Sequence, residues 1–281
     1  MNILKNNCCS TTNNVSFSCS DEDKDAMYHA CVRSYIPYLS PSQLRTLFIN
    51  EIVIEEKCDS GVSAGSFLNK QSVMEFGDLI HQDIFAELTN MGKFVFISSS
   101  LDGNVYVWKR DKKMFVTFRG TSSNMDILID LYFIRSHYKD DIYVHSGIKK
   151  QFMSLEKNIT MEITDDIEEI HFSGYSLGAG LATFASAYYG EKYPNIKVTC
   201  MTFGGPKVGN AGFVKWFDKH VYKGIRMCHC GDPIPLLPFW RGWNHVKNTW
   251  YIKGKTLSDK RSIVLIKKSC HELTNYIHAL L

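Results

Sequence analysis

The chain has 281 residues, of which 44% are hydrophobic, so it can bury a sizeable core and its length suits one large domain better than two. Its 32 basic and 29 acidic residues leave a net charge of +3 with no basic run, which argues against a nucleic-acid-binding protein. The sequence shows no signal-peptide pattern and no apolar run approaching the roughly 18 residues of a membrane span, so we expect a cytoplasmic or peripherally membrane-associated protein.

Polar residues dominate the first part of the chain. Residues 1–20 are rich in Ser, Asn, Thr and Cys, a composition that predicts a flexible N-terminal arm. Residues 21–36 then predict a helix, and Ser40-Pro41-Ser42-Gln43 has the pattern of another helix start. Because no Pro-rich or Gly-rich linker divides the remainder, we assign residues 21–281 to a single domain.

Strands and helices alternate from about residue 94 onward. Short β-branched and aromatic runs predict strands over 94–98, 105–109 and 114–118. The elements predicted beyond them are helices over 146–163, 177–191 and 210–221, strands over 169–173, 197–203, 225–230, 250–253 and 263–267, and a last helix after residue 271. This alternation predicts an α/β fold whose mostly parallel sheet is covered by helices on both faces.

The nine cysteines show no Cys-x-x-Cys spacing. Cys228 and Cys230 flank His229 on a predicted strand, which would suit a metal, but no second ligand pair follows at zinc spacing. We therefore expect no metal site and interpret the cysteines as buried free thiols of a reducing compartment.

A serine motif lies between a predicted strand and a predicted helix. Residues 174–178, Gly-Tyr-Ser-Leu-Gly, match G-x-S-x-G, in which small residues let strand and helix approach while the serine hydroxyl projects above the sheet. The start of the following helix also brings N–H groups and positive dipole character beside the serine. We interpret Ser176 as a catalytic nucleophile; the alternative is a purely structural turn.

Six motifs follow one another along the chain: VTFRGTSS at 116–123, VHSG at 144–147, FSGYSLGAGLA at 172–182, TFGGPKVGN at 202–210, GDPIPLLP at 231–238 and HELTNY at 271–276. In this order they resemble the class 3 lipase family, the fungal-type triacylglycerol lipases and plant phospholipase A1 relatives. The chain departs from the family where Tyr175 replaces the usual His and where Gly-Ala-Gly at 178–180 replaces Gly-Gly-Ala. The resemblance implies an α/β-hydrolase fold for the domain.

The acid of a catalytic triad precedes the base in this fold, in the order Ser, Asp or Glu, His. Asp232 comes directly after the predicted strand 225–230, on a turn fixed by two prolines. Asp218 on a helix and Asp259 in a loop are less well placed. We therefore predict that Asp232 orients the imidazole and stabilises the imidazolium.

Three histidines follow the candidate acid: His245, His271 and His278. His271 follows the predicted strand 263–267 and opens the last helix, and the resemblance implies that the base lies in this H-x-L-x-x-Y segment. His245 resembles a separate, structural histidine of the family, and His278 lies two helical turns beyond His271, where a packing or surface role is expected. We therefore assign His271 as the base for Ser176.

An oxyanion needs two preorganised N–H donors. One is the amide of Leu177, directly after the nucleophile, and the resemblance implies that Thr121 supplies the other, although Thr121 also suits the start of the next helix. Residues 122–134 carry apolar side chains at helical spacing. The family has a mobile lid at this position, and a plain core helix is the alternative.

These residues together predict a serine esterase that hydrolyses carboxylic ester bonds of glycerolipids through an acyl-enzyme on Ser176. Its partner would be a lipid ester at a membrane or lipid-aggregate surface, not nucleic acid, and the chemistry needs no metal or organic cofactor. A phospholipase A1 or galactolipase with the same triad is one alternative. A catalytically silent, lipase-like interaction module is another.

Overall fold

The computed structural model describes residues 3–5, 20–38, 53–58, 93–99, 101, 103–120, 134–252 and 271–280. Its helices are α1 (Asp21–Arg33), α6 (Ser146–Thr160), α7 (Leu177–Lys192), α8 (Ala211–His220) and α9 (Leu273–Leu280), with short 3-10 turns at Ile36–Tyr38 and Ile234–Leu236. The strands are β1 (Ile3–Lys5), β2 (Val53–Cys58), β3 (Lys93–Ser98), β4 (Asn104–Arg110), β5 (Lys113–Phe118), β6 (Arg135–Lys139), β7 (Ile142–His145), β8 (Glu169–Tyr175), β9 (Lys197–Phe203), β10 (Lys223–His229) and β11 (Thr249–Ile252).

The main sheet has the strand order β1-β11-β10-β9-β8-β5-β4-β3-β2, while β6 and β7 form a separate antiparallel pair. Strands β5, β8, β9, β10 and β11 are mutually parallel, and β4 is antiparallel to both of its neighbours. The parallel strands end together, since Phe118 pairs with Gly174 and Tyr175 pairs with Phe203. Residues that follow these strands therefore gather at one edge of the sheet, and the predicted mostly parallel sheet is confirmed.

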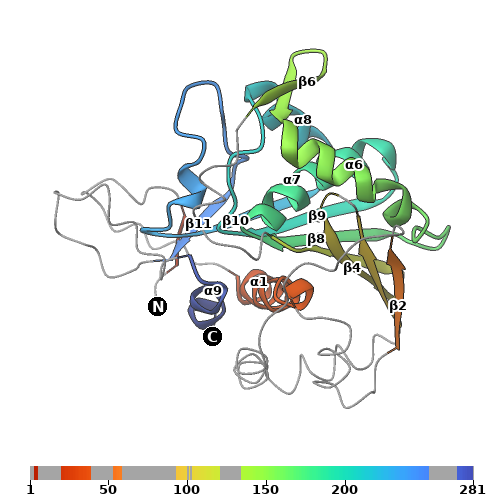
Figure 1. Cartoon of the computed structure of the whole chain (residues 1–281). Helices are drawn as coiled ribbons and strands as arrows, with labels where there is room; N and C mark the ends of the chain where they lie inside the picture. Colours follow the sequence, from red (N-terminus) through yellow and green to blue (C-terminus); the bar gives the residue numbers. More distant parts are fainter. Residues whose placement is uncertain are drawn as a thin grey trace.

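Helices cover both faces of the sheet, as predicted. Figure 1 shows α6, α7 and α8 on one face and α1 with α9 on the other. Helix α7 lies centrally and is buried along nearly all of its length because it is rich in Ala and Gly. None of the helices in the described ranges is long and apolar enough to cross a bilayer.

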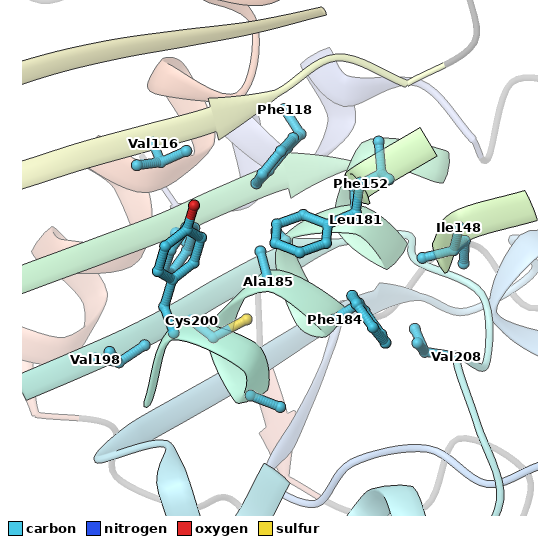
Figure 2. Close-up of a cluster of buried hydrophobic side chains, with 14 of the residues drawn as sticks. Val116, Phe118, Ile148, Phe152, Leu181, Phe184, Ala185, Val198, Cys200 and Val208 are labelled. Atoms are coloured by element: carbon cyan, nitrogen blue, oxygen red, sulfur yellow. The ribbon is translucent and has the colours of Figure 1, made fainter. Parts of the chain in front are cut away.

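The core beneath α7 is built from alternate residues of the strands. Figure 2 shows Phe118 and Phe152 packed beside Leu181 of α7. On β9, Val198 and Cys200 belong to this core, whereas Met201 and Phe203 belong to the core on the α1 and α9 side. The strand is therefore covered on both faces, and all of its residues after Lys197 are buried.

Most predicted elements occur within one or two residues of their expected ends. Strands β1, β2, β6 and β7 are additional to the prediction; β6 has the polar sequence RSHYK and is only partly buried, so it lacks an apolar period. Strand β1 lies within the segment predicted as a flexible arm and pairs antiparallel with β11. The helix start predicted at Ser40 and the strand predicted over 263–267 fall outside the described residues.

The cysteines only partly follow the expectation of free thiols. Cys31, Cys200 and Cys228 are free and buried, and burial raises the pKa of each thiol. Cys230 is disulfide-bonded, and its partner is none of these three. The free-thiol prediction is therefore wrong at Cys230, because the fold and not the sequence spacing decides which two sulfurs come within bonding distance.

Candidate active site

Ser176 occupies the single-residue turn between β8 and α7. Its φ of 58° and ψ of −125° lie in a region that residues with side chains seldom adopt, so the turn stores backbone strain. The Ser176 N–H donates to the Phe203 carbonyl oxygen at 3.0 Å, which ties the turn to the end of β9. The serine hydroxyl is thereby held at the carboxyl edge of the parallel strands.

The glycines on either side of Ser176 allow a very close approach of strand and helix. A Cβ on Gly174 would lie 2.3 Å from the Gly178 carbonyl oxygen, and a Cβ on Gly178 would lie 2.3 Å from the Phe118 carbonyl oxygen. Both contacts are with backbone, which cannot move aside without shifting a strand or the helix. This is the packing that the G-x-S-x-G pattern predicts.

The structure brings the three sequence-predicted triad residues into one hydrogen-bonded chain. The His271 Nε2 lies 2.9 Å from the Ser176 Oγ, and the His271 Nδ1 lies 2.7 Å from an Asp232 carboxylate oxygen. Asp232 follows β10 and His271 precedes α9, so three separate elements supply the chain. All three side chains are buried, and a hydroxyl, an imidazole and a carboxylate in this order can activate the serine as a nucleophile.

Donors surround the Asp232 carboxylate. One oxygen accepts the Ile234 N–H at 2.9 Å, and the other accepts the Tyr276 hydroxyl at 2.7 Å in addition to the His271 ring. Burial raises the pKa of Tyr276 well above its ordinary value, so this hydroxyl remains a donor. Sequence reasoning did not identify Tyr276, although it closes the HELTNY segment that carries His271.

Gly204 leaves the space in which Asp232 and His271 meet. Its φ is +57°, and a Cβ there would lie 2.8 Å from an Asp232 carboxylate oxygen and 2.9 Å from the Tyr276 hydroxyl oxygen. A side chain at this position would therefore push the carboxylate away from the imidazole. Nothing in the local sequence predicts this requirement, because it depends on residues that follow 28 or more positions later.

The other candidate residues engage different partners. The His245 Nε2 lies 2.5 Å from the Pro235 carbonyl oxygen, and burial lowers the pKa of His245 well below its ordinary value, so the neutral ring donates to this carbonyl. His278 is exposed on α9. Asp218 forms an ion pair with Lys247 at 2.8 Å. Of the histidines and aspartates weighed in the sequence, His271 and Asp232 are the pair joined to Ser176.

The candidate oxyanion donors are only partly within the described chain. Leu177 is the first residue of α7, where backbone N–H groups have no carbonyl partner within the helix. Thr121 and residues 122–133 of the candidate lid fall outside the described residues. Gly120, directly before Thr121, lies beside the nucleophile: a Cβ on it would be 3.3 Å from the Ser176 Cβ.

Comparison with known sequences gives a consistent group of relatives. Residues 115–242 match the family described as lipase (class 3). A lipase of Caenorhabditis elegans is 25% identical over 152 residues, covering 51% of this chain and 43% of the relative. A lipase of Rhizopus niveus is 27% identical over 161 residues (52% and 41%), and a chloroplastic phospholipase A1 of Arabidopsis thaliana is 24% identical over 186 residues (54% and 38%). The chain thus spans less than half the length of these curated relatives.

Solved structures share the fold. A lipase from Rhizopus microsporus var. chinensis superposes with a TM-score of 0.63 at 20% identity, covering 85% of this chain and 77% of that one. A triacylglycerol lipase whose catalytic centre is formed by a serine-protease triad gives a TM-score of 0.61 at 19% identity, covering 84% and 82%. The α/β-hydrolase fold implied by the sequence is therefore confirmed.

Proposed function

We propose, from the match of residues 115–242 to the class 3 lipase family, that the chain is a serine esterase that hydrolyses carboxylic ester bonds of glycerolipids. The observation that carries the proposal is the continuous hydrogen-bonded path from the Ser176 hydroxyl through His271 to Asp232. A lipase-like module without activity has no need for a buried imidazole held between a strained serine and a carboxylate. The serine-protease triad named for a structural relative supports the same conclusion.

The proposed reaction proceeds by acyl transfer. His271 accepts the Ser176 hydroxyl proton through Nε2 as the Ser176 oxygen attacks the ester carbonyl, while Asp232 stabilises the imidazolium through Nδ1. The Leu177 N–H, with Thr121 as the family resemblance implies, would stabilise the tetrahedral oxyanion. The imidazolium then protonates the departing alcohol, and a water activated by the same imidazole releases the fatty acid and restores the serine.

The surface next to the candidate acid supports a lipid substrate. Leu236, Phe239 and Trp240 form an apolar rim on the loop that follows Asp232, and their side chains are 55%, 64% and 54% exposed. Aromatic and aliphatic side chains exposed together on one loop are typical of surfaces that contact lipid. We therefore infer that the ester is presented at a membrane or lipid aggregate.

The proposed ester hydrolysis is compatible with more than one lipid headgroup. Relatives of this chain carry the names of lipases and of a phospholipase A1, so a neutral glyceride and a phospholipid or galactolipid are both candidate substrates. A panel of radiolabelled glycerolipids presented in matched vesicles separates them. A triacylglycerol lipase would release label chiefly from the neutral glyceride, whereas a phospholipase A1 would release it from the sn-1 position of the phospholipid.

A fluorophosphonate probe tests the proposal directly, because it reacts with a serine only when a neighbouring base activates the hydroxyl. We expect the probe to label the wild-type protein and not Ser176→Ala. Ser186→Ala is the matched control, since Ser186 is a buried serine of α7, the helix that follows Ser176, and its hydroxyl donates to the Ala182 carbonyl oxygen at 2.6 Å. Absence of labelling in folded wild-type protein would favour the silent module instead.

The base assignment has its own test. His271→Ala is expected to lower kcat by roughly three or more orders of magnitude, as removal of a triad member does in serine hydrolases. His245→Ala removes the bond to the Pro235 carbonyl and should retain most of the turnover. If His245→Ala lost activity while His271→Ala kept it, the assignment of His271 would be wrong.

A further inference from the structure

Tyr175, the residue directly before the candidate nucleophile, contacts His271 in two separate ways. Its hydroxyl donates a hydrogen bond to the main-chain carbonyl oxygen of His271. Its ring also stacks on the imidazole, with ring centroids 4.7 Å apart and planes inclined by 26°. Both contacts join the residue before the candidate nucleophile to the candidate base, which lies 96 positions further along the chain.

We propose that Tyr175 is a positioning residue that fixes the His271 imidazole against Ser176, an inference that rests on the proposed esterase function. Tyr175 ends β8 and Ser176 follows it. Two adjacent residues therefore supply both the candidate nucleophile and the side chain that contacts the candidate base. The separation between the serine oxygen and the imidazole then depends on the rigid end of a central strand. It does not depend solely on the segment that leads into α9.

Other aromatic rings hold Tyr175 in place. The rings of Tyr38 and Tyr276 each lie 6.2 Å from the Tyr175 ring, at inclinations of 59° and 62°. Burial raises the pKa of Tyr175 well above its ordinary value, so its hydroxyl keeps its proton at every pH at which an esterase is assayed. His271 is therefore restrained at its carbonyl and ring face by Tyr175 and at Nδ1 by Asp232, which leaves Nε2 directed at Ser176.

The hydroxyl and the ring of Tyr175 have different chemical consequences. The hydroxyl bond restrains where the imidazole lies, so its loss should increase the time that Nε2 spends out of reach of Ser176. The ring presents a π-face to the imidazole, and such a face favours the protonated form that develops during serine attack. Removing the hydroxyl alone should therefore lower kcat, and removing the ring as well should lower kcat further.

Kinetics of two substitutions separate these roles. The substrate is a soluble p-nitrophenyl ester, assayed below the concentration at which it aggregates. Tyr175→Phe should lower kcat about five- to tenfold with little change in KM and no change in the pH profile. Tyr175→Leu should lower kcat further, because it removes both the hydroxyl bond and the ring that stacks on the imidazole.

Tyr188→Phe is the matched control. Tyr188 is a tyrosine of α7 whose hydroxyl donates to a Glu156 carboxylate oxygen at 3.1 Å, so the change deletes one hydroxyl bond outside the triad. We expect Tyr188→Phe to match the wild type in kcat and in pH profile, even if its thermal midpoint falls. A Tyr175→Phe variant whose kcat equals that of Tyr188→Phe would overturn the inference.

Proton NMR tests the inference without requiring turnover. The proton shared between the His271 Nδ1 and Asp232 should give a resolved downfield resonance in wild type and Tyr188→Phe, and an exchange-broadened one in Tyr175→Phe. If wild type neither reacts with fluorophosphonate nor cleaves esters while the resonance follows this pattern, the esterase proposal fails and the positioning of His271 stands. An identical resonance in Tyr175→Phe would contradict the positioning role whether or not the protein is an esterase.

Discussion

Asp232 illustrates how single residues define this site. A buried carboxylate without partners is costly, and Asp232 avoids that cost by accepting bonds from the Ile234 N–H, the Tyr276 hydroxyl and the His271 ring. The bonds also fix the orientation of the carboxylate, which in turn fixes the imidazole. Tyr276 is itself anchored, because its hydroxyl accepts the His229 N–H at 3.1 Å.

Removing the Tyr276 hydroxyl should therefore impair turnover more than stability. We predict that Tyr276→Phe lowers kcat about tenfold or more, since hydrogen bonds to charged groups contribute roughly 1.5–3 kcal/mol. Ester hydrolysis and thermal unfolding measured on the same preparation check this. Tyr189→Phe is the control: Tyr189 is a fully buried tyrosine whose hydroxyl donates to the Glu156 carbonyl oxygen at 3.1 Å, outside the triad. Equal kcat for wild type and Tyr276→Phe would contradict the role.

At the scale of elements, helix α7 depends on glycine differently along its length. A Cβ on Gly178 would meet only backbone, with the Phe118 carbonyl oxygen 2.3 Å away. A Cβ on Gly180 would first meet the Ile148 Cδ1 at 2.7 Å, the end of a flexible side chain. The start of the helix is thus fixed against the strands, while two residues further on the packing can adjust.

This difference predicts that substitution by alanine changes the free energy of unfolding at Gly178 but hardly at Gly180. Gly178→Ala should destabilise the fold by about 3 kcal/mol, because the clash can be relieved only by moving a strand or the helix. Gly180→Ala should be nearly neutral, since Ile148 can rotate and alanine raises helix propensity by about 1 kcal/mol. Chemical denaturation of both variants gives the comparison. Equal free energies of unfolding would show that the helix start is less constrained than the contacts indicate.

Helix α6 begins with an unusual cap. The His145 Nδ1 accepts the Gly147 N–H at 3.0 Å and the Ile148 N–H at 3.2 Å, so the ring must be neutral at Nδ1. Burial lowers the pKa of His145 to about 4, whereas in the unfolded chain an ordinary pKa of about 6.5 applies. The folded state therefore resists protonation of His145. The contribution of the neutral His145 ring to the free energy of unfolding is complete above pH 6.5 and is lost as the pH falls toward 4.

Replacing the histidine by asparagine should remove this pH dependence. Asn is a good N-cap and does not titrate, so His145→Asn keeps an acceptor for the helix. Between pH 7 and pH 4.5 we predict that the wild type loses about 2 kcal/mol more unfolding free energy than His145→Asn. Urea titrations at intervals across that range measure the unfolding free energy of both proteins. The other titrating groups are the same in both, so their effects cancel in the difference. Parallel curves for the two proteins would rule out His145 as the source.

At the scale of the whole molecule, the candidate site and the apolar rim lie on the same loop. The rim of Leu236, Phe239 and Trp240 begins four residues after Asp232, so the surface that we propose to contact lipid also carries the candidate acid. The loop is held from beneath by the Lys207 ammonium, which donates to the Leu236 and Pro238 carbonyl oxygens at 2.9 and 3.0 Å. Adsorption through the rim would bring lipid to the site without unfolding the loop.

Polar substitution of the rim should separate adsorption from chemistry. We predict that the double variant Phe239→Ser with Trp240→Ser lowers binding to phospholipid vesicles at least about tenfold while hydrolysis of a soluble monomeric ester is retained. Tyr222→Ser is the control, because Tyr222 is a 71% exposed aromatic residue directly before β10, at the opposite end of that strand from Asp232. Vesicle sedimentation measures the binding, and undiminished binding of the double variant would place lipid contact elsewhere.

Local patterns in the sequence determined where most of the helices and strands of this protein lie. Apolar periodicity located β3, β4, β5, β8 and β9 and the helices between them, because a strand or helix must present its apolar residues at its own period. The G-x-S-x-G pattern located the turn at Ser176 for a similarly local reason, since the small residues and the strained turn adjoin in sequence. Strand β6 was missed because its exposed polar sequence has no such period.

Only the tertiary structure decided which distant residues meet. It joined Ser176 to His271 across 95 positions and His271 to Asp232 across 39, and it showed that His245 bonds to Pro235 instead. Gly204, Tyr175 and Tyr276 owe their importance to neighbours that the chain brings together only on folding. The physical reason is that short-range pattern fixes the conformation of an element, whereas the position of one side chain against another depends on how the whole sheet and its helices pack.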